Sequence, residues 1–150
     1  MDTPLCVDAS VVVRLLVDTA ESDRVQQLWE KWEVEGRALV APSMLYYEVT
    51  NALYRYERGG FLTADEVQQG LVLASGLQIH LLSDPALHLE AAVLARSLSL
   101  SAAYDSHYLA LAQRLGAEFW TADRRLTRQV GPALPFVRCV IEGPGTSSGT

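Results

Sequence analysis

The chain has almost no lysine. Of its 12 basic residues, all but Lys31 are arginine. This absence argues against two classes of α/β protein that also carry aspartates at strand ends, the phosphoacceptor receiver domains and the haloacid-dehalogenase-type phosphatases. Both need a lysine near a late strand, whereas Lys31 lies in an early helical segment. The dehalogenase type also needs a second aspartate two residues after the first, and here Ser10 stands in that place after Asp8.

The sequence also has only two cysteines, no long apolar run and no leader-like N-terminus. Cys6 and Cys139 both lie in apolar, strand-like runs, so we expect two buried, reduced thiols, and nothing in the sequence supports a disulfide. No apolar run approaches the ~20 residues that span a bilayer. The first ten residues hold no basic segment followed by an apolar one, so they do not resemble a signal peptide. We therefore expect a cytoplasmic protein.

The composition that remains is that of a folded domain. Hydrophobic residues make up 49% of the chain and charged residues 20%, a globular balance rather than a disordered one. A chain of 150 residues is long enough for one domain with a substantial core. We expect this domain to cover residues 1–142, followed by a low-complexity, flexible tail at 143–150.

The net charge of −6 argues against nucleic-acid binding, because such domains are usually basic. Two considerations weaken that argument. Arginine makes bidentate contacts to phosphate that lysine cannot make. Acidic residues that gather to hold metal ions are also neutralised in use, so the net charge misrepresents such a site.

Strand-like and helix-like segments alternate along the chain. Short apolar runs predict strands at 5–8, 38–42, 78–82, 118–122 and 136–140. Apolar residues at helical spacing predict helices at about 10–17, 22–35, 43–58, 64–75, 85–98 and 105–115. Strands separated by helices imply right-handed crossovers, and therefore an α/β fold with a parallel sheet covered on both faces.

Four carboxylates stand out against this pattern. Asp8 and Asp123 follow predicted strands, where ligands bind in an open parallel sheet. Asp105 begins a predicted helix, and Glu48 lies inside another. Each has an ordinary alternative explanation, because aspartate is a favoured helix N-cap worth ~1 kcal/mol and a glutamate can lie on a solvated helix face.

The residues around Glu48 favour a role in a functional site over a place on a solvated helix face. Its helix carries an apolar stripe of Leu45, Val49, Ala52, Leu53 and Tyr56. A second strip runs along the edge of that stripe and consists of Glu48, Asn51, Arg55 and Arg58. A carboxylate, an amide and two guanidiniums beside a core suit a site that holds a metal and a phosphate.

Metal-assisted phosphodiester hydrolysis is the chemistry that uses such a set. Mg²⁺ and Mn²⁺ prefer carboxylate and water oxygens in octahedral geometry. They activate a water molecule and stabilise charge on the phosphate oxygens. Without metal the acids repel one another, so we expect raised and coupled pKa values in the cluster.

Four stretches in order resemble the PIN domain, and specifically the toxin ribonucleases of the VapC type. They are VDASVVVRLLV, YYEVTNAL, YDSHYLALAQRLGA and FWTADRRL. The positions that match the family's four motifs are Asp8, Ala9 and Ser10, then Glu48, Asn51 and Leu53, then Tyr104, Asp105 and Tyr108, and finally Thr121, Asp123 and Leu126. The resemblance spans about residues 5–140.

The resemblance implies a three-layer α/β/α sandwich around a short, mainly parallel sheet. It also implies Mg²⁺ or Mn²⁺ as cofactor, RNA as substrate, endoribonuclease activity that prefers single strands, a cognate antitoxin as partner and a homodimer. The alternative is a PIN-fold protein that binds RNA or a partner without cutting. Retention of all four acids argues against it, because a self-repelling cluster is of no use to such a protein.

The resemblance also suggests a role for each site residue. Asp8, Asp105 and Asp123 are expected to be direct or water-mediated metal ligands, and Glu48 to hold the metal or orient the attacking water. Three polar residues are expected to fix these acids in place: Ser10, Asn51 and Thr121. Three arginines are candidate phosphate contacts: Arg14, Arg55 and Arg124. Trp29 and Trp32 are expected in the core, and His107 on a helix surface.

Overall fold

The computed structural model describes residues 3–141 of the chain. The expected domain end at 142 and the tail at 143–150 lie outside the described residues. In the described part, no helix combines the length and apolar character that a membrane crossing needs.

A parallel sheet forms the middle layer. Its strands are β1 (Leu5–Val7), β2 (Leu39–Pro42), β3 (Ile79–Leu82), β4 (Glu118–Thr121) and β5 (Val137–Cys139). Their order across the sheet is β3-β2-β1-β4-β5, and every neighbouring pair is parallel. The expected strands are confirmed, each one or two residues shorter than predicted.

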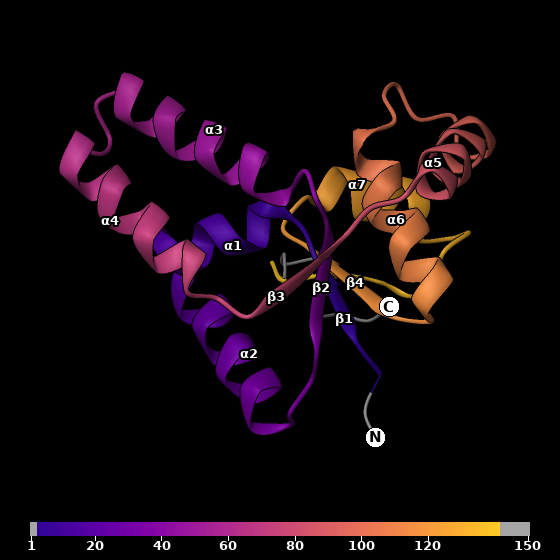
Figure 1. Ribbon diagram of the computed structural model, residues 1–150, viewed down its shortest axis with the longest axis horizontal. Helices are drawn as coiled ribbons and strands as arrows, with labels where there is room; N and C mark the ends of the chain where they lie inside the picture. The colour runs from indigo at the N-terminus through magenta and orange to yellow at the C-terminus, as the bar shows by residue number, and fades with distance from the viewer. Residues whose placement is uncertain (1–2, 142–150) are drawn as a thin grey trace.

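Helices cover both faces of this sheet. They are α1 (Ala9–Leu16), α2 (Ser22–Val34), α3 (Leu45–Arg58), α4 (Ala64–Ser75), α5 (Pro85–Ser97), α6 (Tyr104–Leu115) and α7 (Arg124–Val130). Figure 1 shows α1 to α4 on one side of the strands and α5 to α7 on the other. Right-handed crossovers produce this division, because the chain moves from β1 to β3 in one direction and from β3 to β5 in the other. The expected three-layer α/β/α fold is confirmed.

The core follows from strands that are apolar on both faces. Every residue of β1 and β2 is buried, as expected for central parallel strands. Trp29 and Trp32 are 5% and 3% exposed, which confirms their expected place in the core. Cys6 is buried as expected, but Cys139 is only half-buried because β5 is an edge strand.

Two helix starts differ from the prediction. The helix expected from 43 begins at Leu45, because Pro42 still belongs to β2 and the next two residues form a turn. The helix expected from Asp105 begins one residue earlier, and its N-cap, Ala103, makes no side-chain bond. Asp105 is therefore not the N-cap of α6 but an acid in its first turn.

The strand order places the site. Going outward from β1, the chain builds β2 and β3 on one side, and β4 and β5 on the other. The order therefore reverses between β1 and β4, and ligands bind at such a switch point beyond the carboxyl ends of the strands. Asp8 directly follows β1, and Asp123 lies two residues beyond β4.

Candidate metal and catalytic site

Asp8 is held on both of its carboxylate oxygens. It is 7% exposed and caps α1, with Oδ1 accepting the Ser10 N–H at 3.0 Å. The same oxygen accepts the Ser10 hydroxyl at 2.5 Å, and Oδ2 accepts the Thr121 hydroxyl at 2.6 Å. The Asp8 side chain therefore joins the end of β1 to the end of β4.

The two hydroxyls that hold Asp8 are themselves oriented by backbone amides. The N–H of Ala122 donates to Ser10 Oγ at 2.8 Å, and the N–H of Asp123 donates to Thr121 Oγ1 at 3.1 Å. Because each hydroxyl oxygen accepts an amide proton, its own proton is free to point at Asp8. Ser10 and Thr121 thus each donate a hydrogen bond to the Asp8 carboxylate.

Burial makes the charge of Asp8 costly. It raises the pKa of Asp8 from 3.8 to about 6, against the lowering effect of the hydrogen bonds from Ser10, Thr121 and Val11. The charge of Asp105 adds a smaller upward contribution. Desolvation therefore outweighs the hydrogen bonds at this carboxylate.

Glu48 is held by a tyrosine from the other side of the molecule. The hydroxyl of Tyr108, on α6, donates to Glu48 Oε1 at 2.5 Å. Tyr108 is 1% exposed, and its ring lies 5.9 Å from that of Phe119 between centroids. Tyr108 belongs to a motif of the family resemblance, but the sequence suggested no role for it. Its position among the apolar residues of the helix indicates only that it is buried.

Asp105 and Asp123 line one hollow of about 210 Å³. Asp123 caps α7, with Oδ1 accepting the Leu126 N–H at 3.0 Å. Among the described residues, no hydrogen bond or ion pair engages the carboxylate of Asp105. Of the four acids, Asp105 is therefore the one whose carboxylate makes no hydrogen bond or ion pair within the described residues.

Electrostatics link the four carboxylates. The pKa of Asp105 is raised by partial burial of the side chain, although the residue as a whole is exposed, and then by the charges of Asp123 and Glu48. Asp105 in turn raises the pKa of Asp8, so it is coupled to each of the other three. Within the described residues none of the four is paired with a basic side chain.

The four acids do not form a closed coordination sphere on their own. Between residues 3 and 141, no three Asp, Glu, His or Cys side chains are grouped so that they could hold a metal ion as they stand. Asp8, Glu48 and Asp123 each bond to a different protein donor instead. The donor set still fits a hard divalent cation, because it consists of oxygen ligands with uncompensated negative charge.

In the described part of the chain, the side chains of the other predicted site residues, which are the amide and the three arginines, make no hydrogen bond or ion pair with the four acids. Arg14 donates to Glu21 Oε1 at 3.0 Å and to the Ser10 carbonyl at 3.1 Å, so its charge is already paired. Asn51 is exposed and bonds to none of the four acids in the described structure. The other two arginine candidates, Arg55 and Arg124, are exposed. Sequence reasoning missed Arg125, which lines the hollow of Asp105 and Asp123.

His107 is occupied away from the acids. Its Nδ1 lies 2.6 Å from the Ala103 carbonyl, and its Nε2 lies 3.0 Å from Nδ1 of His88. This pairing agrees with the expectation that His107 is a helix-surface residue and not a ligand.

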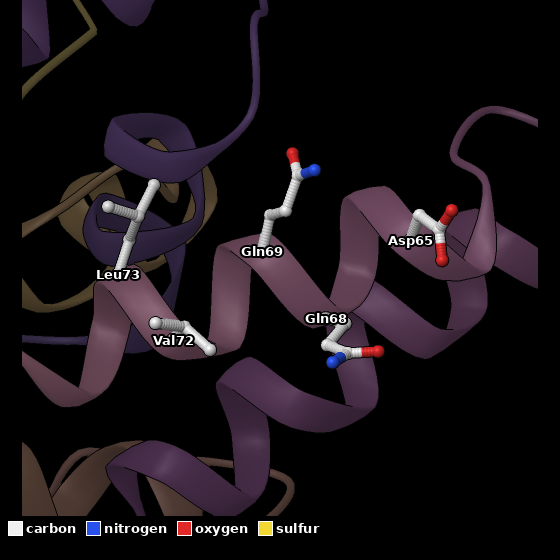
Figure 2. A pocket seen from close by; sticks show the side chains of 5 residues that line it. All are labelled: Asp65, Gln68, Gln69, Val72 and Leu73. Carbon is white, nitrogen blue, oxygen red and sulfur yellow. The ribbon is translucent and has the colours of Figure 1, made fainter.

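A larger hollow elsewhere carries no comparable chemistry. It measures about 480 Å³ and lies on α4, where it is lined by Asp65, Gln68, Gln69, Val72 and Leu73. Figure 2 shows that these side chains all come from one helix and point in different directions. A helix face with a single carboxylate offers no convergent polar groups for catalysis.

Comparisons with known proteins agree with this geometry. A model of the PIN domain matches residues 5–131. Ribonuclease VapC3 of Pyrobaculum aerophilum is 29% identical over 134 residues, which are 87% of this chain and 96% of that protein.

Solved structures share the fold over almost the whole chain. The crystal structure of PAE2754 from Pyrobaculum aerophilum has a TM-score of 0.62 at 25% identity, and the match covers 93% of this chain and 92% of that one. A toxin-antitoxin complex from Klebsiella pneumoniae has a chain with a TM-score of 0.68 at 16% identity, covering 93% of this chain and 99% of that one.

Proposed function

This chain belongs to the PIN domain family, and on that premise we propose that it is a metal-dependent endoribonuclease and the toxin of a toxin-antitoxin pair. The observation that carries the proposal is the set of four carboxylates at the switch point between β1 and β4, none of which is paired with a basic side chain within residues 3–141. The relative named as a ribonuclease, which aligns with 87% of the chain, supports RNA as the substrate.

Asp8, Glu48, Asp105 and Asp123 would hold Mg²⁺ or Mn²⁺ in this proposal. Such an ion, when bound, supplies an activated water and neutralises charge on the phosphate oxygens. Ser10 and Thr121 keep the Asp8 carboxylate in one orientation. Tyr108 occupies Oε1 of Glu48, which leaves Oε2 to face the metal or the attacking water.

The choice of Mg²⁺ or Mn²⁺ rests on the donor atoms. All four candidate ligands are carboxylates, and His107 is engaged with His88 and Ala103. Sites that prefer zinc or copper use imidazole and thiolate, whereas magnesium and manganese sites use oxygen.

Metal removal tests the proposal directly. The purified protein is expected to cleave single-stranded RNA with Mg²⁺ or Mn²⁺ present, to stop when EDTA is added, and to resume when metal is restored in excess. Cleavage is followed with an end-labelled oligoribonucleotide on a denaturing gel. RNA binding without cleavage under every metal condition would instead support the non-catalytic PIN-fold alternative.

Substitution of Tyr108 by phenylalanine tests the hold on Glu48. We expect kcat and the affinity for Mn²⁺ each to fall by about 10–100-fold, the usual effect of removing a hydrogen bond to a metal-holding group. The free energy of unfolding should fall by only about 1 kcal/mol, because the aromatic packing remains. Calorimetric Mn²⁺ titration and steady-state cleavage measure both effects.

Tyr54→Phe is the matched control, because Tyr54 is an exposed tyrosine on the same helix as Glu48. It should leave both quantities unchanged. If Tyr108→Phe behaves like this control in Mn²⁺ titration and in cleavage, Tyr108 does not position Glu48.

The proposed partners are RNA, a cognate antitoxin and a second copy of the chain, acting in the cytoplasm. A hollow of about 600 Å³ lies between the end of α1 and the helices α3 and α4. Apolar side chains line it, among them Leu16 of α1, Leu73 of α4, and Phe61 of the segment that joins α3 to α4. An amphipathic helix can place its apolar face in such a hollow, which is a common mode of peptide recognition.

A further inference from the structure

The hollow that contains Asp105 and Asp123 has a second, basic and polar side. It lies between the segment that joins α5 to α6 and the exposed face of α7. Its lining residues are Leu100, Ser101, Ala102, Asp105, Asp123, Arg125, Leu126 and Gln129. Leu126, which is buried, adds an apolar side chain to this lining.

Arg125 is unpaired despite two carboxylates in the same hollow. No acidic side chain in the described structure lies within ion-pair distance of it. By contrast, Arg114 bonds to both Asp84 and Glu90, and Arg14 bonds to Glu21. The Arg125 guanidinium is therefore available for an external anion, and its planar fork matches a phosphate.

The size and polarity of the hollow fit one monomer unit of a bound polymer and not a whole small-molecule ligand. Its volume of about 210 Å³ is below the ~300–1,000 Å³ of pockets that enclose a whole small ligand. Gln129 Nε2 lies 3.5 Å from the Ser99 carbonyl, at the outer limit of a hydrogen bond. Its amide can turn toward a ligand at little cost and offers both a donor and an acceptor to a base edge.

We propose that this hollow binds the nucleotide next to the scissile phosphate of single-stranded RNA. Arg125 contacts the phosphate of that nucleotide, and Gln129 hydrogen-bonds the edge of its base. The inference rests on the proposed ribonuclease function and adds to it a residue that contributes to affinity and one that contributes to sequence preference. A base in a duplex is paired along its Watson–Crick edge, so this arrangement favours an unpaired nucleotide.

Arg125→Gln tests the phosphate contact, with Arg128→Gln as the matched control. Arg128 is exposed on the same helix, three residues further on, and does not line the hollow. Arg125→Gln should weaken binding of a labelled single-stranded oligoribonucleotide about tenfold for every sequence. The slope of log affinity against log salt should fall by about 0.7, the loss of one phosphate contact on a single strand. Arg128→Gln should stay within about twofold of the unaltered protein.

Gln129→Leu tests the base contact. Cleavage of a pool of oligoribonucleotides randomised around one site should change in sequence preference, whereas Arg125→Gln should lower all rates alike. Both variants should keep the metal-induced rise in melting temperature, which shows that the acids are undisturbed.

The outcomes separate this inference from the function on which it rests. If the protein cleaves RNA and Arg125→Gln matches Arg128→Gln, or Gln129→Leu keeps the original preference, the subsite is wrong and the nuclease stands. If the protein binds RNA through Arg125 but never cleaves it, the nuclease proposal is wrong, and what stands is a nucleotide-binding hollow without an adjacent cleavage site.

Discussion

Replacing Asp8 by asparagine is expected to lower kcat for RNA cleavage at least about a thousandfold, while the protein remains folded. The size follows from the several kcal/mol of charge stabilisation that a divalent ion supplies to a phosphoryl transition state, at 1.36 kcal/mol for each factor of ten. Asp8 is the most buried of the four acids, and two hydroxyls and two backbone amides fix its direction. An asparagine preserves the shape but removes the charge that would hold the ion.

The control for this experiment is Asp65→Asn. Asp65 is an exposed aspartate on α4 (Figure 2), and Figure 1 shows this helix away from the strands β1 and β4. It carries the same change in charge and should cleave at the original rate. Equal activity of Asp8→Asn and Asp65→Asn would remove Asp8 from the mechanism, and circular dichroism of both variants excludes unfolding as the cause of any loss.

The stability of the metal-free protein is expected to fall as the pH rises, and Asp8 is the main reason. Because its folded pKa of about 6 exceeds its ordinary value of 3.8, the folded state binds the proton more tightly than the unfolded state. The protonated form therefore stabilises the fold below about pH 4, and this contribution is lost between about pH 4 and pH 6. A shift of about two units corresponds to about 3 kcal/mol.

Asp8→Asn should consequently be more stable than the unaltered protein in EDTA above pH 6, by up to about 3 kcal/mol, and equally stable near pH 4. For a domain of this size that difference corresponds to a rise of about 6–12 °C in melting temperature. Thermal unfolding in EDTA from pH 4 to pH 8 measures it. A difference that is independent of pH would show that Asp8 is not the titrating group.

Metal should largely cancel this difference in stability. Mg²⁺ or Mn²⁺ at 100 times its Kd stabilises a protein that binds it only when folded by about 2.7 kcal/mol. Melting temperatures at pH 7.5 should therefore rise with metal in the unaltered protein and hardly change in Asp8→Asn, with KCl of equal ionic strength as the control. No rise at millimolar metal would mean that the four acids do not converge on an ion.

Local patterns in the sequence were sufficient for the layers of the fold. Alternating apolar runs and helical spacing predict the strands and most helices to within two residues, because these signals depend on neighbours in the chain. Asp8 and Asp123 were placed beyond strand ends on the same basis, and each also caps the following helix. Capping and metal binding are thus compatible roles for these two acids.

Helix boundaries beside proline and loops were less predictable. Pro42 ends β2 and so delays α3 to Leu45. Asp105 had the residue type of an N-cap, yet the helix starts before it. In both cases the competing preferences are worth only about 1 kcal/mol, so packing of the neighbouring strand or loop decides the boundary.

By itself, the sequence determined the α/β class, and it singled out the four acids together with Ser10 and Thr121 as candidate site residues. The tertiary structure decided the contacts between distant segments: Thr121 with Asp8, Tyr108 with Glu48, and the hollow shared by Asp105 and Asp123. It also placed Arg125 in that hollow, whereas Arg124 lines a second hollow, of about 340 Å³, together with Asp123 and Arg125. Successive side chains on a helix point about 100° apart, so the packing of α7 decides which hollows each arginine lines.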